Sequence, residues 1–184
     1  MKRLCIFCGS ANGNSEKYIE QARAIGKLIA NQNVGLVYGG GKVGIMGAVA
    51  NSVLENKGEV IGVIPKSLVT AEVAHHEVTQ LHIVDDMHSR KKMMYDLSDA
   101  FLILPGGMGT LDEMFEILTW SQLGLHRKPI YILNEFGFYD SLLDYIRHSH
   151  SEGFIKKEHL GLINEIKNVE DDLRYIITSL FVTL

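Results

Sequence analysis

Three short apolar segments of the chain each run directly into a glycine-rich loop, and a helix-like segment follows every one of these loops. The loops are Gly9-Ser10, Gly39-Gly40-Gly41 and Gly106-Gly107-Met108-Gly109-Thr110. In open α/β sheets, ligands bind at the carboxyl ends of the strands, where such loops lie. The pattern therefore predicts an α/β fold with a ligand-binding edge.

The rest of the chain continues the alternation of strand-like and helix-like segments. We expect strands at 5–8, 34–38, 59–64, 81–84, 100–104 and 130–133, and helices at 15–32, 45–57, 87–97, 110–123, 138–150 and 169–181. Repeated β-loop-α units of this size imply a parallel sheet with helices on both faces. Because no linker, repeat or low-complexity segment interrupts the pattern, we predict a single domain over residues 1–184.

Composition and charge exclude several classes of protein. The 184 residues include 46% hydrophobic and 22% charged residues, which is ordinary for a soluble globular domain. The net charge of −4 predicts neither a nucleic-acid partner nor an anionic membrane. No apolar run approaches the roughly 18 residues of a membrane span, and the short N-terminal apolar stretch is typical of a buried strand rather than a signal peptide. We expect a cytoplasmic protein.

The two cysteines, Cys5 and Cys8, form a C-x-x-C pattern. Residues three apart on a strand point to opposite faces, and the chain has no second cysteine pair. Two buried core cysteines are therefore favoured over a zinc or redox site. The eight histidines include no helical i, i+4 pair with a nearby acid, so we predict no metal site.

The glycine loops are suited to an anionic ligand. A helix that begins at such a loop presents free backbone N–H groups and a positive dipole end, and glycine lets an anion approach closely. One such loop could be a plain turn, but three in one small domain favour a nucleotide or sugar-phosphate. Ser10 and Gly41, in the first two loops, are candidate contacts.

Known nucleotide motifs narrow this ligand. Residues 39–44 satisfy G-x-G-x-x-G, but they follow the second strand, and the next strand ends at Pro65 without an acid for a ribose hydroxyl. A dinucleotide is thereby disfavoured. Val43 stands where an NTPase phosphate loop needs Ser or Thr. A mononucleotide fits better.

Glu113 has two interpretations. Thr110-Leu111-Asp112-Glu113 is a T-x-x-E capping box at the start of a helix, which gives Glu113 a structural role. Alternatively, Glu113 lies one turn into a helix whose N-terminus holds a phosphate, and it faces the sugar of the ligand. The spacing favours neither interpretation over the other.

Arg90 belongs to the basic run Ser89-Arg90-Lys91-Lys92. Successive helical residues lie about 100° apart, so the run forms no single patch, and a solvated face is the simple interpretation. Arg90, however, shares a helix face with Met87, Met94 and Leu97, which favours an inward side chain. A buried guanidinium in a cleft binds phosphate or carboxylate well.

Nearby, Glu72 and Glu77 lie in an irregular segment, and their spacing alone favours surface carboxylates.

Two strings of residues carry a resemblance to a known family. Pro105–Glu113, which reads PGGMGTLDE, and Asp86–Lys91, which reads DMHSRK, together resemble the LOG (Lonely Guy) family of cytokinin riboside 5′-monophosphate phosphoribohydrolases, formerly mislabelled as lysine decarboxylases. The likeness continues through Cys8–Ser10, Val37–Gly41 and Thr119–Gly124, and it covers almost the whole chain.

The resemblance implies a Rossmann-like homodimer with sites near the dimer interface, and it requires no metal or organic cofactor. It makes Arg90 and Glu113 the catalytic pair and the 107–110 loop the 5′-phosphate site. The expected substrate-binding residues are Ser10, Gly41, Glu72, Arg90, Lys91, Gly106, Gly107, Met108, Gly109, Thr110, Glu113 and Thr119.

The implied reaction releases a free base, adenine or an N6-modified adenine, and ribose 5-phosphate from a nucleoside 5′-monophosphate. Its transition state places positive charge on the ribose, which a carboxylate such as Glu113 stabilises, or the carboxylate activates water. Arg90 stays protonated, so we assign it to positioning and charge stabilisation.

A nucleotide-binding or sensing protein without turnover is the alternative. Amino-acid decarboxylation would need a pyridoxal-bearing lysine, for which no motif argues.

The helix expected at 110–123 is apolar over more than one face. Its apolar residues are Leu111, Met114, Phe115, Leu118, Trp120 and Leu123. A helix packed only on its own sheet needs one apolar stripe, so the surplus favours burial against a second copy. The alternative is a helix buried twice within one subunit.

Overall fold

The computed structural model describes residues 1–69 and 74–181, with side chains as far as Thr178. Its strands are β1 (Arg3–Phe7), β2 (Gly35–Tyr38), β3 (Val60–Pro65), β4 (Gln80–Val84), β5 (Ala100–Ile103), β6 (Ile130–Leu133) and β7 (Asn164–Ile166). Its α-helices are α1 (Lys17–Asn31), α2 (Gly44–Glu55), α3 (Met87–Asp96), α4 (Met108–Gln122), α5 (Asp140–Ser151), α6 (Lys157–Leu160) and α7 (Arg174–Phe181).

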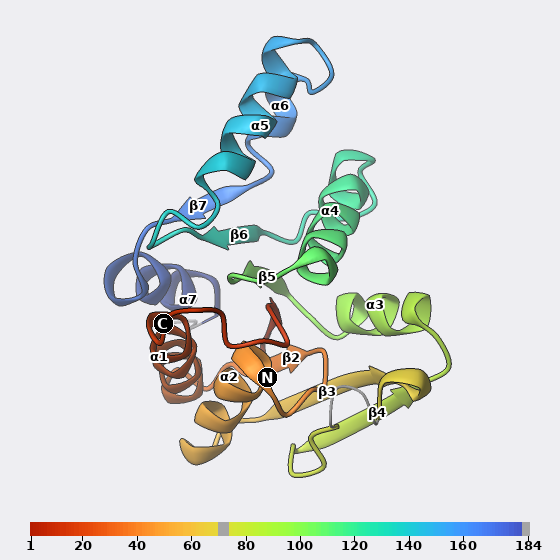
Figure 1. Cartoon of the computed structure of the whole chain (residues 1–184), viewed down its shortest axis with the longest axis vertical. Coiled ribbons are helices and arrows are strands. Elements are labelled where there is room, and N and C mark those ends of the chain that lie inside the picture. The colour runs from red at the N-terminus through yellow and green to blue at the C-terminus, as the bar shows by residue number, and fades with distance from the viewer. Residues whose placement is uncertain (70–73, 182–184) are drawn as a thin grey trace.

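All strands in the described part of the chain join one parallel sheet in the order β4-β3-β2-β1-β5-β6-β7 (Figure 1). The chain first moves outward from β1 to β4 and then returns to place β5 beside β1. The loops that follow β1 and β5 therefore diverge from a topological switch point, where doubly wound sheets bind their ligands. This order brings residue 9 beside residue 105, and the Gly9 amide donates to the Pro105 carbonyl over 3.0 Å.

Helices cover both faces of the sheet and enclose two hydrophobic cores. Leu4 and Ile6 of β1 point into the core formed with α1, α2 and α7, whereas Cys5 and Phe7 point into the core formed with α3, α4 and α5. Such alternation with both faces buried is what a parallel sheet between two helical layers requires. The predicted Rossmann-like α/β class is confirmed.

Cys5 and Cys8 are both buried free thiols, and they belong to different cores. The interpretation of two core cysteines is confirmed. Within the two described stretches, no helix is long and apolar enough to cross a membrane.

The expected strands and helices are present, with ends shifted by a few residues. In the described part of the chain three elements are additional, namely a 3-10 turn at Lys66–Leu68, the four-residue helix α6 and the three-residue strand β7. Only Ile166 of β7 is buried. An element of three residues with one buried side chain has no recognisable hydrophobic period. The last expected helix begins as a π-helical turn at Val169–Leu173 and continues as α7.

Candidate functional site

A polar pocket of about 200 Å³ opens at the switch point between β1 and β5. We call it the site pocket. It is lined by Cys8, Gly9, Ser10, Met46, Arg90, Gly107, Met108, Gly109, Thr110 and Glu113. Four segments distant in sequence therefore meet here, namely the end of β1, the start of α2, α3 and the start of α4.

The N-terminus of α4 forms one end of the site pocket. Its N-cap is Gly107, and no side chain caps it. A Cβ atom added to Gly107 or Gly109 would meet nothing within 4 Å, although Gly106 beside them is tightly packed. Packing within the chain thus does not require glycine at 107 or 109. Their open space and the uncapped amides of the first turn suit an anion that approaches the backbone closely.

The capping-box interpretation of Glu113 is wrong. The helix begins at Met108, so Thr110 is its third residue rather than its N-cap. Gly107 has extended backbone angles (φ −99°, ψ −152°), and a glycine N-cap leaves the first-turn amides open. Glu113 consequently lies in the second turn of α4, where it is 9% exposed and lines the site pocket.

Arg90 of α3 meets Glu113 inside the pocket. Its Nη2 lies 3.9 Å from the Glu113 Oε1 and donates a hydrogen bond of 3.2 Å to the Gly39 carbonyl. Arg90 is 5% exposed, which confirms the inward orientation expected from its helix face. Gly39 makes this position possible, because a Cβ there would lie 2.0 Å from the Arg90 Nη2. The glycine loop after β2 thus supports Arg90.

Cys8 lines the same pocket and is buried. Burial raises the pKa of its thiol well above the usual range, and the nearby Glu113 carboxylate raises it further. The thiol is therefore protonated at neutral pH and is a poor nucleophile. The electrostatic character of the pocket is set by Arg90, Glu113 and the dipole of α4.

Comparisons with known proteins fit this geometry. A family model described as "Possible lysine decarboxylase" matches residues 46–176. A cytokinin riboside 5′-monophosphate phosphoribohydrolase of Rhodococcoides fascians is 48% identical over 92% of this chain and 86% of its own length. One from Arabidopsis thaliana is 47% identical over 84% of this chain and 72% of its own. The chain belongs to the LOG family.

Solved structures support the fold assignment of this LOG-family chain. The molybdenum cofactor carrier protein of Chlamydomonas reinhardtii superposes with a TM-score of 0.73, covering 99% of both chains at 18% identity. The molybdenum cofactor binding protein of Rippkaea orientalis gives a TM-score of 0.71 at 20% identity, covering 97% of this chain and 98% of the other. At these identities the likeness extends to the fold alone.

Most of the residues implied by the LOG resemblance meet in the site pocket. Ser10, Arg90, Glu113 and the residues of the 107–110 loop all line it. Gly106 lies just behind the loop, where a Cβ would be 2.1 Å from the Thr110 Oγ1. Cys8 and Met46 also line the pocket, although no sequence motif predicts a role for them there. For Cys8 the available signal was its position directly before the first glycine loop.

Three of the expected substrate contacts, Gly41, Lys91 and Thr119, do not line the site pocket of this LOG-family chain. Gly41 is buried and pairs with Ala74 in an isolated antiparallel bridge. Lys91 lies between Asp112 and Glu116, 3.1 Å from each carboxylate. Burial opposes the charge on Lys91, but these two carboxylates outweigh it and raise its pKa.

Thr119 lies on a different flank of α4, where its hydroxyl donates to the Phe115 carbonyl over 2.7 Å. It lines a separate small hollow with residues of α5 and the following segment.

Glu72 falls outside the described residues. Glu77 is exposed and pairs with Lys42 over 3.0 Å, as expected for a surface carboxylate. Among the residues that the structure places, no group of three or more His, Cys, Asp or Glu side chains could hold a metal ion.

Proposed function

We propose that this protein hydrolyses the N-glycosidic bond of adenosine 5′-monophosphates, with or without an N6 substituent, and releases the base and ribose 5-phosphate. The observation that carries the proposal is the buried Glu113–Arg90 pair beside the uncapped N-terminus of α4. Glu113 follows Gly109 by one helical turn, about 6 Å along the axis. A ribose ring fits between a phosphate at the first turn and a reacting carbon at Glu113.

The phosphate is bound by the start of α4 in this proposal. The first-turn amides donate to its oxygens, and the helix dipole favours its negative charge. Gly107 and Gly109 leave room for this approach because they have no side chains. A nucleoside without the phosphate cannot use these interactions, so the monophosphate is the preferred substrate.

Glu113 acts at the sugar. Departure of the base leaves positive charge on the ribose, and a preorganised carboxylate stabilises that charge and orients the attacking water. Arg90 holds the carboxylate in place and, because its guanidinium stays protonated, contributes no proton to the base. Decarboxylation through a pyridoxal group is disfavoured, because the residues that line the site pocket include no lysine.

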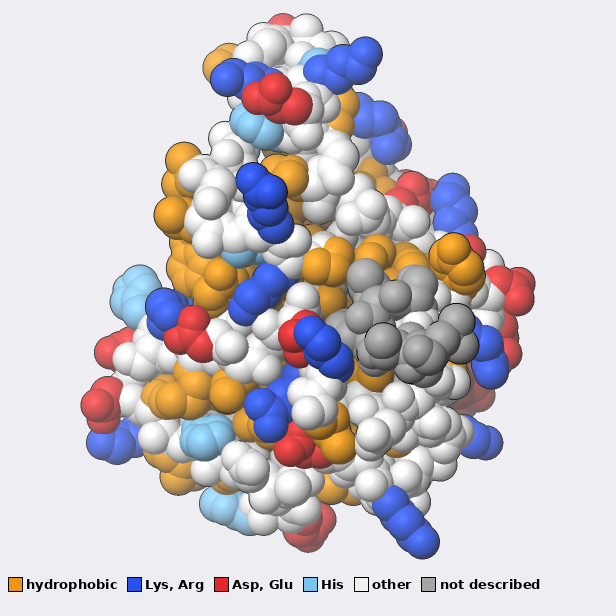
Figure 2. All heavy atoms as spheres, turned by 180° about the vertical axis from the view of Figure 1, so that it is seen from behind, with side chains coloured by type: hydrophobic (Ala, Val, Ile, Leu, Met, Phe, Trp, Pro, Cys, Tyr) orange, Lys and Arg blue, Asp and Glu red, His pale blue; other side chains and the backbone are white. Residues whose placement is uncertain are grey.

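A homodimer forms part of the proposal. Six positions separate Glu113 from Thr119, which places their side chains about 120° apart around α4 and nearly two turns apart along it. Thr119 lines a hollow separate from the site pocket of its own chain, so in this proposal it would reach the site of a second copy. Phe115, Leu123 and Leu125 are 39%, 66% and 66% exposed, and hydrophobic side chains gather on the flank that carries α4 (Figure 2). A second copy would cover this apolar surface.

The test is base release measured by chromatography from AMP, N6-isopentenyl-AMP and adenosine. We expect release from both monophosphates and far slower release from adenosine. Glu113→Gln should lower turnover at least about 100-fold, the scale for losing one preorganised electrostatic group. Thermal denaturation checks that this variant folds. Binding of AMP without release would support a sensing protein instead, and a folded Glu113→Gln variant with full turnover would remove Glu113 from the reaction.

A further inference from the structure

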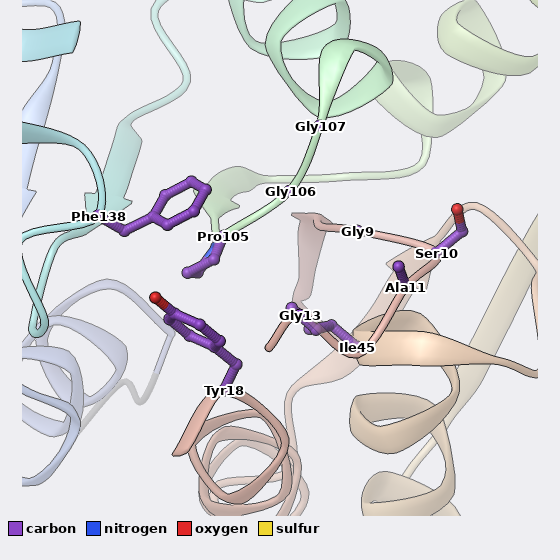
Figure 3. A pocket seen from close by; sticks show the side chains of 10 residues that line it. All are labelled: Gly9, Ser10, Ala11, Gly13, Tyr18, Ile45, Pro105, Gly106, Gly107 and Phe138. Atoms are coloured by element: carbon purple, nitrogen blue, oxygen red, sulfur yellow. The ribbon is translucent and has the colours of Figure 1, made fainter. Parts of the chain in front are cut away.

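A second pocket of about 280 Å³ lies beside the site pocket, and we call it the aromatic pocket (Figure 3). It is lined by Gly9, Ser10, Ala11, Gly13, Tyr18, Ile45, Pro105, Gly106, Gly107 and Phe138. Figure 3 shows the rings of Tyr18 and Phe138 on one side of the space and Ala11 and Ile45 on the other. The lining carries no charged side chain, so the pocket is suited to an uncharged, largely apolar group.

The two rings are fixed in position by their neighbours. Their centroids lie 5.9 Å apart with an interplanar angle of 78°, an edge-to-face arrangement. Phe138 also packs edge-to-face on Tyr139 at 4.9 Å. Gly13 has a φ of +75°, and a Cβ there would lie 2.9 Å from the Tyr18 ring. The pocket is therefore preformed, although Phe138 remains 44% exposed.

The aromatic pocket and the site pocket share Gly9, Ser10 and Gly107 as lining residues. Two of these shared residues have no side chain, and the third is exposed. Gly107 is also the N-cap of α4. The anion-binding end of α4 consequently lies between the two pockets, with the Glu113–Arg90 pair on one side and the Tyr18–Phe138 pair on the other.

We propose that the aromatic pocket binds an aromatic group esterified to the 5′-phosphate of the nucleotide. This rests on the proposed function, because it places the phosphate at the first turn of α4. The ribose and its glycosidic bond would extend into the site pocket, while the ester group would extend toward Tyr18 and Phe138. The protein would then accept adenosine 5′-phosphodiesters as well as monophosphates. Backbone amides tolerate the single charge of a diester, since they are neutral donors.

Two synthetic probes separate the ring from the charge. The phenyl ester and the methyl ester of AMP carry the same charge, and only the phenyl ester can fill the aromatic pocket. We expect the phenyl ester to bind at least about 10-fold more tightly in calorimetric titration and in competition with AMP hydrolysis, since it buries a ring against two others.

Two phenylalanines provide matched variants. Phe138→Ala should abolish the phenyl preference and leave AMP turnover unchanged, because Phe138 lies outside the site pocket. Phe136 is similarly exposed at 39% and contacts the same Tyr18 ring at 6.0 Å, but it does not line the aromatic pocket. Phe136→Ala should therefore retain the preference.

The outcomes distinguish this inference from the proposed function. Equal binding of the two esters, or a phenyl preference that survives Phe138→Ala, would overturn the inference while AMP hydrolysis stands. Absence of both AMP binding and AMP hydrolysis would overturn the proposed function and this inference with it.

Discussion

Gly39→Ala should displace the Arg90 side chain from its position in the site pocket without changing any residue that contacts the substrate. Gly39 has no positive φ, so alanine fits its backbone, and the effect of the substitution is purely steric. The new Cβ would lie 2.0 Å from the Arg90 Nη2 and 3.0 Å from the Met46 sulfur. Ordinary van der Waals contact begins near 3.4 Å, so the guanidinium must move by about 1.4 Å.

This displacement sets the expected size of the effect. Arg90 would lose its 3.2 Å hydrogen bond to the Gly39 carbonyl and its 3.9 Å approach to Glu113. Misplacement of a positioning group by about 1 Å costs on the order of 100-fold in rate, which corresponds to about 2.7 kcal/mol of transition-state stabilisation. We expect kcat for base release from AMP to fall by that factor, with a smaller change in KM, because the phosphate site on α4 is intact.

The assay compares Gly39→Ala with Gly161→Ala. A Cβ at Gly161 would approach nothing closer than 3.9 Å, and Gly161 ends the distant helix α6, so this control should keep wild-type turnover and stability. Thermal denaturation accompanies the kinetics. A well-folded Gly39→Ala protein with wild-type kcat would refute the reasoning, since it would show that the position of Arg90 does not matter to the reaction.

Three further outcomes follow from the packing, the charges and the surface. Gly106→Ala should lower the melting temperature, because its Cβ would lie 2.1 Å from the Thr110 Oγ1, whereas Gly109→Ala, inside α4 and in open space, should not lower it but should bind AMP more weakly; equal melting temperatures would contradict this. Burial lowers the pKa of His75 below its usual 6.5. As the pH is lowered through about 6.5, the unfolded chain therefore takes up a proton that the native imidazole does not, and the free energy of unfolding decreases. His75→Asn should flatten that dependence in urea denaturation at pH 5.5 and 7.5, and an unchanged slope would count against it. Light scattering should give twice 20.6 kDa for the wild type and a monomer of low activity for Leu123→Asp; a fully active wild-type monomer would contradict the shared site.

Local features of the sequence were sufficient for the fold class and for the inward Arg90. Short apolar strands, glycine loops and helical periods depend on neighbours within a few residues, and those neighbours are adjacent in the sequence. The apolar stripe that Arg90 shares with Met94 predicted its burial, and the spacing of Cys5 and Cys8 predicted their separation between two cores. The strand β7 was missed because three residues are too few to establish a period.

The tertiary structure alone decided what each glycine loop does. The strand order places the end of β1 against the end of β5, and it turns the loop after β2 toward Arg90 rather than into the pocket lining. It also brings Tyr18 and Phe138 together from segments 120 residues apart and separates Thr119 from Glu113 on the same helix. Such pairings arise because the packing of whole strands and helices determines which loops meet, and local sequence patterns do not specify that packing.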